Sequence, residues 1–370
     1  MKGTSGHQRD FWPAMGFLLP NLIGFLVFTA GPVLFSLGIA FTNWDLQRTV
    51  PFRWIGLGNF TELVADQQFW LYFLNTAYLM LGMPFAIAGS LFLAILLSQR
   101  LRGIVVYRTL FYLPTFTSGV ALMILWKALY NPDFGPINAA INWVMATLGV
   151  KNAAAPVWLL STKNVFGLAI VLAVAFGLFA AYKVARVALG LSARWILVAA
   201  LAFVAFVCLW PWGVGLEVEE VGLSRAQWGL GARDAIMIMG IWIAIGGSNM
   251  LLYLAALSNV PQELYEAAQI DGAGRWATFC HVTWPQLAPT TFFIVVMSFI
   301  GGLQGGFEQA RVMTNGGPAG TTTTLVYYIY TKAFEEFQIG YASAVSWVLF
   351  VIIFAVTLVN WKFGSKELGY

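Results

Sequence analysis

Residues 70–98 read WLYFLNTAYLMLGMPFAIAGSLFLAILLS, and no charged side chain interrupts them. A helix needs about 20 consecutive apolar residues to cross the hydrocarbon core of a bilayer, which is about 30 Å thick. This stretch exceeds that minimum and ends just before the basic residue Arg100. It therefore predicts a membrane-spanning helix.

The same pattern recurs along the chain, in which 59% of the residues are hydrophobic and only 10% are charged. Soluble domains carry roughly 25% charged residues. Eight apolar runs lie at 16–42, 70–98, 106–128, 165–182, 195–213, 235–257, 290–306 and 340–361. The first run is too long for the apolar region of a signal peptide, so we expect it to be retained. The predicted fold class is an all-α integral membrane protein with about eight transmembrane helices, in which residues 1–370 form a single transmembrane domain.

Composition argues against several other kinds of site. Cys208 and Cys280 have unlike surroundings, which disfavours a disulfide framework. His7 and His281 lie far apart and have no neighbouring ligand motif, so we expect no metal site. The net charge of +4 comes without a basic cluster. Membrane orientation explains this charge better than nucleic-acid binding does.

The distribution of Lys and Arg predicts the orientation of the chain. If the N-terminus is cytoplasmic, the inside segments hold 11 of the 20 basic residues and 5 of the 16 acidic ones. The outside segments then hold the remaining 9 basic and 11 acidic residues. An excess of Lys and Arg on the cytoplasmic side is the usual bias of membrane proteins. We therefore expect both termini, and the polar segment 258–289, to be cytoplasmic.

Segment 258–289 has the local signals of a helical hairpin. Ser258, Asn259 and Pro261 supply capping and first-turn residues for a short helix. Gly272 can end that helix, because glycine adopts the left-handed conformation at low steric cost. A second helical piece is expected from about Arg275, stopping before Pro285, since proline restricts the residue that precedes it.

The order of residues in this hairpin resembles the EAA loop of membrane subunits of binding-protein-dependent ABC importers. In that family, EAA is followed by three residues, Gly, nine residues and then Ile-x-Leu-Pro. The matching residues here are Glu266, Ala267, Ala268, Gly272, Val282, Trp284 and Pro285. Trp284 stands in the place of leucine and is the larger departure from the pattern.

The resemblance extends over most of the chain and is to the sugar-transporting branch of the family. The segments that carry it are FTNW at 41–44, YRTLFYLP at 107–114, NPDFGPIN at 131–138, VPQELYEAA at 260–268, NGGP at 315–318 and GYASAVSWVLF at 340–350. It implies a six-span core in a bacterial or archaeal cytoplasmic (inner) membrane. The substrate implied is a sugar, or a related polyol or sugar phosphate.

The resemblance also implies the partners. They are a second related permease subunit forming a heterodimer, two copies of an ATPase subunit and an extracytoplasmic solute-binding protein. The hairpin would dock on the ATPase as a coupling helix through Glu266, Ala267, Ala268 and Gly272, with Asp271 and Pro285 fixing the loop shape. ATP and Mg²⁺ are then expected on the partner. The sequence itself has no Gly-Lys dipeptide, which a P-loop requires, so we expect this chain to bind no cofactor and to be no enzyme.

The resemblance lapses in residues 160–233, where two additional apolar runs flank the basic stretch KVARVALGLSAR at 183–194. A pair of spans crosses out and back, so the topology of everything after it is unchanged. Lipid-facing support is the simplest role for this inserted hairpin, and a substrate or partner role is the alternative. The acidic run Glu217, Glu219 and Glu220 that follows is either a solvated face or a docking site for a binding protein.

Polar side chains within apolar runs are candidates for a substrate pathway, because they are costly in hydrocarbon. Hydroxyl and amide groups suit hydroxyl-rich solutes, although they also form helix-to-helix hydrogen bonds. The candidates are Ser248, Asn249, Gln304, Glu308 and Gln309.

Two rival functions remain open at this point. An ion-coupled secondary transporter would carry ionisable residues near the middle of its spans, whereas Asp234 and Glu308 lie at span edges. A membrane-embedded enzyme would need a clustered nucleophile and base or a set of metal ligands, and the sequence offers neither.

Overall fold

The computed structural model describes residues 5–47, 51–99, 102–149, 157–160 and 231–364. Within these ranges the chain is helical and contains no strand, apart from an isolated antiparallel bridge between Thr42 and Trp54. The all-α fold class is therefore confirmed. The expected spans 165–182 and 195–213, which belong to the inserted hairpin 160–233, lie outside the described residues.

Five described helical stretches are long and apolar enough to cross a membrane: Met15–Ile39, Gln67–Ser98, Ala232–Ser258, Arg275–Gln304 and Ile339–Asn360. A sixth candidate span is the pair Ile104–Phe116 and Gly119–Leu129, which bends by 102° at the break between them. Six of the eight apolar runs thus correspond to described helices.

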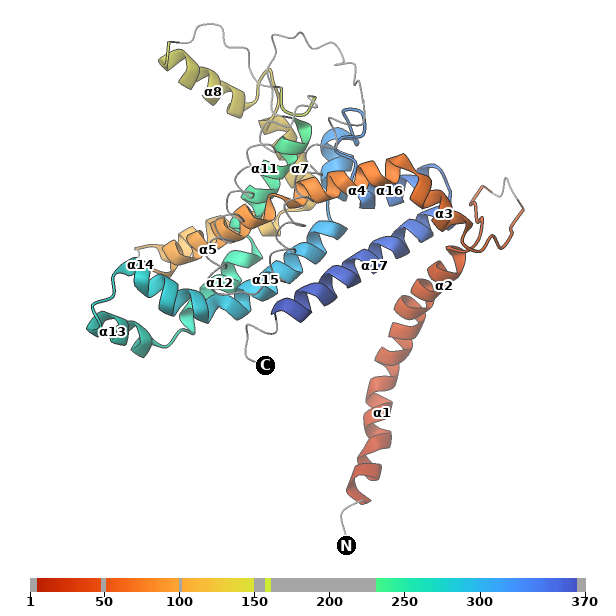
Figure 1. The fold of residues 1–370 in the computed structure, drawn as a ribbon, viewed down its shortest axis with the longest axis horizontal. Coiled ribbons are helices and arrows are strands. Elements are labelled where there is room, and N and C mark those ends of the chain that lie inside the picture. The colour runs from red at the N-terminus through yellow and green to blue at the C-terminus, as the bar shows by residue number, and fades with distance from the viewer. Residues whose placement is uncertain (1–4, 48–50, 100–101, 150–156, 161–230, 365–370) are drawn as a thin grey trace, which may run out of the picture. The chain divides into compact units, whose positions relative to one another are not determined.

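One compact unit consists of Met1–Gln67 and Ile329–Ile352. Its elements, visible in Figure 1, are α1 (Ser5–Phe25), η1 (Leu26–Ala30), α2 (Gly31–Ile39), α3 (Gly58–Ala65), η5 (Thr331–Glu335) and the first part of α17 (Ile339–Gly364). The N-terminal helices expose large apolar side chains, including Phe17 at 87% and Phe28 at 82%. Apolar exposure on this scale suits contact with lipid.

Within this unit, the FTNW turn at 41–44 packs against the start of α17. The Gly340 N–H donates to the Trp44 carbonyl at 3.0 Å. A Cβ at Gly340 would collide with the Thr42 carbonyl, so only glycine permits this approach. The buried Asn59 amide also donates to the Ala40 and Thr42 carbonyls, each at 2.8 Å. The turn is therefore held by its own backbone and by two separate helices.

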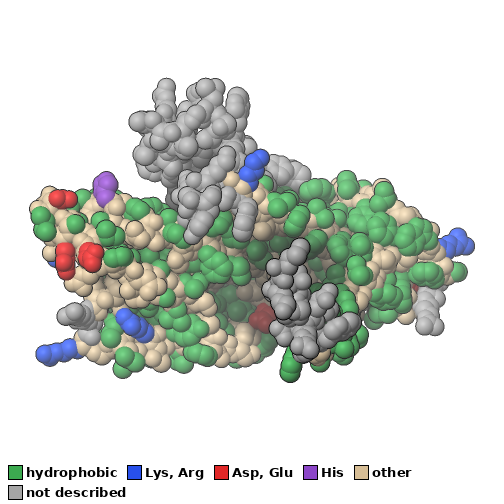
Figure 2. All heavy atoms as spheres, turned by 90° about the horizontal axis from the view of Figure 1, so that it is seen from below, with side chains coloured by type: hydrophobic (Ala, Val, Ile, Leu, Met, Phe, Trp, Pro, Cys, Tyr) green, Lys and Arg blue, Asp and Glu red, His purple; other side chains and the backbone are tan. Residues whose placement is uncertain are grey.

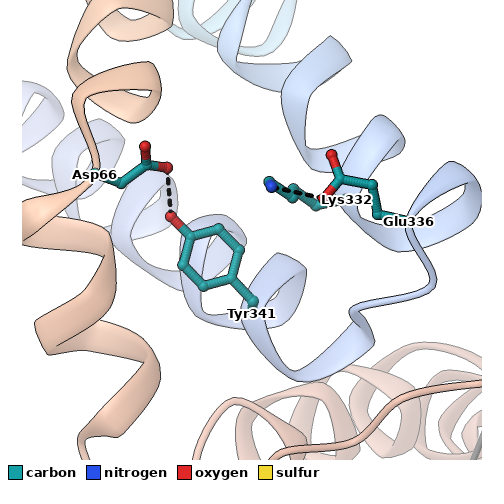
Figure 3. Close-up of polar contacts among 4 residues, drawn as sticks. All are labelled: Asp66, Lys332, Glu336 and Tyr341. Carbon is teal, nitrogen blue, oxygen red and sulfur yellow. Dashed lines mark hydrogen bonds and ion pairs between the residues drawn. The ribbon is translucent and has the colours of Figure 1, made fainter. Parts of the chain in front are cut away.

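Two polar contacts tie the same unit together near η5 (Figure 3). The Tyr341 hydroxyl of α17 donates to Asp66 Oδ2 at 2.8 Å. Lys332 Nζ donates to Glu336 Oε2 at 2.7 Å and lies 5.8 Å from the centroid of the Tyr341 ring. The Tyr341 hydroxyl thus joins the residue that follows α3 to α17, and the Tyr341 ring lies beside the Lys332–Glu336 pair.

The other unit consists of Gln68–Tyr328 and Ile353–Tyr370. Its elements are α4 (Gln67–Met80), α5 (Met83–Ser98), α6 (Ile104–Tyr112), η2 (Leu113–Phe116), α7 (Gly119–Leu129), α8 (Pro136–Thr147), α11 (Ala232–Ile245), α12 (Ser248–Ser258), α13 (Gln262–Ile270), α14 (Arg275–Thr278), η3 (Phe279–Thr283), α15 (Trp284–Gln304), η4 (Gln309–Thr314), most of α16 (Leu325–Tyr330) and the last part of α17.

The core of this unit lies between α5, α12 and α15. Leu91 and Leu97 of α5 pack with Tyr253 of α12 and with Leu287 and Ile294 of α15, all buried. A second apolar cluster joins α7 to α11. Tight packing also occurs where α11 meets α12, because a Cβ at Gly246 would collide with the Phe111 carbonyl. These contacts fix the frame from which the hairpin 258–289 projects.

The second helical piece of the hairpin does not stop before Pro285, so that expectation was wrong. Helix runs without a break from Arg275 to Gln304. Pro285 lies at the start of α15, directly after the π-helical turn η3. A wider turn can accommodate a proline that lacks a backbone N–H. The predicted span 290–306 is consequently the continuation of the second hairpin helix.

Candidate coupling hairpin and transport cavity

The first helix of the hairpin, α13, ends in a Schellman motif. The N–H of Ala273 donates to the Ala268 carbonyl at 2.9 Å, and the N–H of Gly272 donates to the Gln269 carbonyl at 3.1 Å. Gly272 has φ +73°, the left-handed conformation that this motif requires. The predicted helix end at Asp271-Gly272 is therefore confirmed, and the turn to α14 is set by local geometry.

The tip of the hairpin presents both charged and large apolar side chains. Ile270 and Trp276 are 86% and 76% exposed, and Glu263, Glu266 and Asp271 are exposed beside them. Figure 2 shows acidic side chains gathered over the region of α13 and α14, among hydrophobic and other polar side chains. An exposed surface of this mixed composition has the character of a protein–protein interface.

The base of the hairpin is anchored differently from its tip. Ala268 is 9% exposed and faces inward, whereas Ala267 is exposed. The hydroxyls of Tyr265 and Thr283 form a hydrogen bond at 3.2 Å. This bond links α13 to η3, so the two arms of the hairpin are joined near the point where they leave the bundle.

A cavity of about 350 Å³ lies in the same unit, between α4, α5, α11, α12 and α15. This volume falls within the range of about 300–1,000 Å³ typical of small-molecule sites. Glycines account for much of its wall: Gly82, Gly240, Gly301, Gly302, Gly305 and Gly306. The polar residues that line it are Thr76, Asn249, Ser298, Gln309 and Thr324. Uncharged donors and acceptors are thus the polar groups available to a solute here.

The structure brings two of the five candidate pathway residues together, since Asn249 and Gln309 both line this cavity. Ser248 and Gln304 are exposed and do not line it. Glu308 is exposed and lies against the first residue of α7, where a Cβ at Gly119 would collide with its carboxylate. A carboxylate near a helix N-terminus is favourably placed, which accounts for Glu308 without a solute.

The segment 316–324 reaches the cavity through Thr324 and is held in place by α4. The Asn75 amide donates to the carbonyls of Gly320 at 2.8 Å and Thr323 at 3.0 Å. The next residue, Thr76, accepts the N–H of Leu325 at 2.9 Å. Since Thr76 and Thr324 also line the cavity, the tethered segment borders it, and we call residues 316–324 the roof segment.

Charged residues of α11 complete the support of this roof. Arg233 Nη1 donates to Asn75 Oδ1 at 3.0 Å, and its guanidinium lies 5.0 Å from the centroid of the Tyr78 ring. The Tyr78 hydroxyl donates to Asp234 Oδ1 at 2.6 Å. All four side chains are at most 3% exposed. Buried polar groups joined in this way specify one arrangement of the helices they connect.

Sequence reasoning missed Asn75, Thr76, Ser298 and Thr324 as cavity or roof residues. Asn75, Thr76 and Ser298 interrupt apolar runs just as Asn249 does, so the same criterion could have found them. Thr324 closes the run TTTT at 321–324, which gives no such signal. In the described part of the chain, no group of three or more His, Cys, Asp or Glu side chains could hold a metal ion.

Comparison with known proteins agrees with this architecture. The family model described as "Binding-protein-dependent transport system inner membrane component" matches residues 72–361. The chain is 31% identical over 378 residues to the probable ABC transporter permease protein YesP of Bacillus subtilis, with 100% of this chain and 96% of YesP covered. It is 24% identical over 371 residues to the sn-glycerol-3-phosphate transport system permease protein UgpA of Pectobacterium atrosepticum, with 98% and 97% covered.

A solved structure shares the fold. It is a bacterial ABC transporter involved in the import of the acidic polysaccharide alginate, with a TM-score of 0.67 and 22% identity. The match covers 97% of this chain and 96% of that one. The matched family model, the extent of the YesP alignment and the EAA-type hairpin lead to the same assignment. This chain belongs to the family of binding-protein-dependent transport system inner membrane components, and is a multi-pass permease subunit of an ABC importer.

Proposed function

We propose that this chain forms half of the pathway by which a sugar, or a related polyol or sugar phosphate, enters the cell. The names of its relatives support this substrate class, because they include a glycerol-3-phosphate permease and an alginate importer. The cavity lined by Asn249, Gln309 and Thr324 supports it as well, since hydroxyl and amide groups match hydroxyl-rich solutes. Family membership favours this ATP-driven reading over ion-coupled transport.

The main structural support for the mechanism is the exposed surface of the hairpin tip. Ile270 and Trp276 are strongly exposed on a turn whose shape is fixed by the motif at Gly272. A rigid turn that presents apolar anchors suits docking into a cleft of a second protein. In the proposal that protein is an ATPase subunit, which binds ATP and Mg²⁺. Glu266, Ala267, Ala268, Asp271, Gly272 and Pro285 belong to the docking element.

The remaining partners follow from the same mechanism. A second related permease subunit pairs with this chain as a heterodimer, two ATPase copies dock on the cytoplasmic hairpins, and a solute-binding protein delivers the sugar on the opposite side. With this orientation both termini are cytoplasmic, in agreement with the distribution of Lys and Arg. Docking and release of the hairpin would then switch the cavity between its two openings.

The test uses the complex co-purified through this chain and reconstituted in lipid vesicles. Gly272→Pro removes the left-handed turn, because proline holds φ near −65°. We expect it to abolish the ATP hydrolysis that the sugar-loaded binding protein stimulates, while the chain remains inserted. Gly274→Ala is the matched control, because Gly274 has no atom within 4 Å of an added Cβ.

Either of two results would contradict the proposal. Normal stimulation in Gly272→Pro would exclude the hairpin as the coupling element. Recovery of the chain as a homo-oligomer that transports solute without ATP would exclude the importer mechanism itself. Loss of stimulation in both glycine variants would instead point to general damage, which circular dichroism and co-purification of the ATPase would detect.

A further inference from the structure

A second hollow, of about 810 Å³, lies where the hairpin leaves the bundle. It is bounded by the last turns of α5 and α12, by α6, and by the inner sides of both hairpin arms. Ser98 and Ser258, which end α5 and α12, are among its lining residues. Because both helices are candidate spans that end here, the hollow lies at the level of the boundary between membrane and water.

Two arginines from different parts of the chain line this hollow: Arg108 from the bundle and Arg275 from the hairpin. Arg108 uses Nε and Nη2 on the Leu97 carbonyl, at 3.3 and 2.7 Å, and its Nη1 makes no hydrogen bond to a described residue. Arg275 is exposed, and its side chain makes no hydrogen bond to a described residue. Donors therefore remain available on both sides of the hollow.

The described lining contains no acidic residue that could neutralise these two cations. The acidic residues of the hairpin, Glu263, Glu266 and Asp271, are exposed and do not line the hollow. The hydroxyls of Ser98 and Ser258 already donate to the carbonyls of Ile95 and Ala255. Two arginines in one lining without an acidic neighbour favour an anion with several oxygen acceptors, such as a phosphate.

The remaining lining residues favour a phospholipid headgroup over free inorganic phosphate. Ile95, Leu254, Leu257 and Phe279 provide an apolar wall beside the two arginines. A free inorganic phosphate would gain nothing from this wall, whereas the acyl chains and glycerol backbone of a phospholipid would cover it. Basic pockets between transmembrane helices on the cytoplasmic side are known to bind anionic lipid headgroups.

We propose that this hollow binds the phosphate headgroup of an anionic phospholipid, held between Arg108 of α6 and Arg275 of the hairpin. The bound lipid bridges the bundle and the base of the coupling hairpin, close to the Tyr265–Thr283 bond. Lipid composition then sets how firmly the hairpin is held. This regulatory consequence rests on the proposed function, but the binding itself does not.

The experiment is native mass spectrometry of the full chain with its co-purifying partners, titrated with phosphatidylglycerol or phosphatidylcholine. We expect retention of phosphatidylglycerol by the parent chain and a roughly tenfold weaker affinity in Arg275→Gln, as expected for a lost charged hydrogen bond. Arg102→Gln is the matched control, because Arg102 is exposed, lies near α6 in sequence and does not line the hollow. Its affinity should match that of the parent.

Equal phosphatidylglycerol retention by the parent, Arg275→Gln and Arg102→Gln would overturn the proposal. Equal retention of phosphatidylcholine and phosphatidylglycerol by the parent would do so too, because the two arginines would then confer no preference for an anionic lipid. Displacement of the lipid by millimolar inorganic phosphate would overturn the lipid source and identify a site for free phosphate. These results do not depend on ATP hydrolysis, so failure here is distinguishable from failure of the proposed transport function.

Discussion

The coupling hairpin and the roof of the cavity are both turns between helices, but they are held in opposite ways. The hairpin turn at Gly272 is closed by hydrogen bonds between residues at most five positions apart. The roof segment 316–324 is held by Asn75, about two hundred and fifty positions away along the chain. The hairpin tip is exposed, whereas Asn75, Arg233 and Asp234 are almost fully buried.

The two turns are therefore stabilised by different kinds of contact. Local bonds around a left-handed glycine need no distant partner, so the hairpin can keep its shape without support from the rest of the bundle. The roof depends on buried polar groups, and leaving any of them without a partner costs its desolvation energy. The first turn therefore depends on its own residues alone, whereas the second keeps one arrangement until several bonds break together.

The largest effect is expected from Asn75→Leu. This change removes the two bonds to the roof carbonyls and the acceptor for Arg233. With these buried groups unsatisfied, we expect a loss of about 4 kcal/mol in the free energy of unfolding. Denaturant titration in mixed micelles measures it. Asn142→Leu is the control, because Asn142 is exposed on α8. If Asn75→Leu lost no more unfolding free energy than Asn142→Leu, the roof segment would have to be held by other contacts.

A smaller loss is expected from Tyr78→Phe, which removes only the hydroxyl that donates to Asp234. Hydrogen bonds to charged groups contribute about 1.5–3 kcal/mol, so we expect destabilisation of about 2 kcal/mol by the same titration. The double variant with Asn75→Leu should lose less than the sum of the two, because both act on one network. Strict additivity would show that the Tyr78–Asp234 contact and the roof tether are independent.

Gly272→Ala tests the hairpin side of the comparison. Its φ of +73° strains alanine and most other residues with a Cβ, and the left-handed conformation costs them roughly 1–2 kcal/mol. Since the hairpin tip has few tertiary contacts, we expect the damage to appear as faster amide hydrogen exchange in residues 262–273, with the unfolding midpoint of the bundle little changed. Gly272→Asn should behave almost as the parent, because asparagine tolerates this conformation. A large shift in the global midpoint would place the hairpin within the cooperative core.

The smallest effect is expected from Tyr265→Phe, which removes the hydroxyl bond to Thr283 at the base of the hairpin. A neutral bond between partly buried groups contributes about 0.5 kcal/mol. Hydrogen exchange of α13 should rise modestly, and Thr283→Val should give the same change with no further effect in the double variant. Additive effects would mean that the two hydroxyls act on different partners.

Much of this fold could be predicted from composition and local pattern. The apolar run at 70–98 predicted a span because hydrocarbon admits such a helix on the length and polarity of its own residues. Gly272 predicted the end of α13 because left-handed backbone is a local property of glycine. The predicted helix end before Pro285 was wrong, because that prediction also used a local rule. The π-helical turn before Pro285 lets the helix continue.

The candidate pathway residues were also only partly predictable from the sequence. Asn249 was found because an amide within an apolar run is conspicuous in the sequence, and the structure places it on the cavity beside Gln309. Ser248 is adjacent in sequence yet lies off the cavity, since successive residues on a helix face different directions. Glu308 met the same criterion, but its carboxylate lies at the start of α7.

Membrane-spanning helices and a polar helical hairpin at 258–289 could be predicted from the sequence alone, because span length, polarity and a left-handed glycine are properties of short stretches of chain. The contact of Asn75 of α4 with Arg233 of α11 and with the segment 316–324 could be seen only in the folded structure. The placement of Arg108 and Arg275 in the lining of the same hollow was likewise visible only in the folded structure. The reason is physical: these contacts join residues far apart along the chain, and their partners are chosen by how the helices pack.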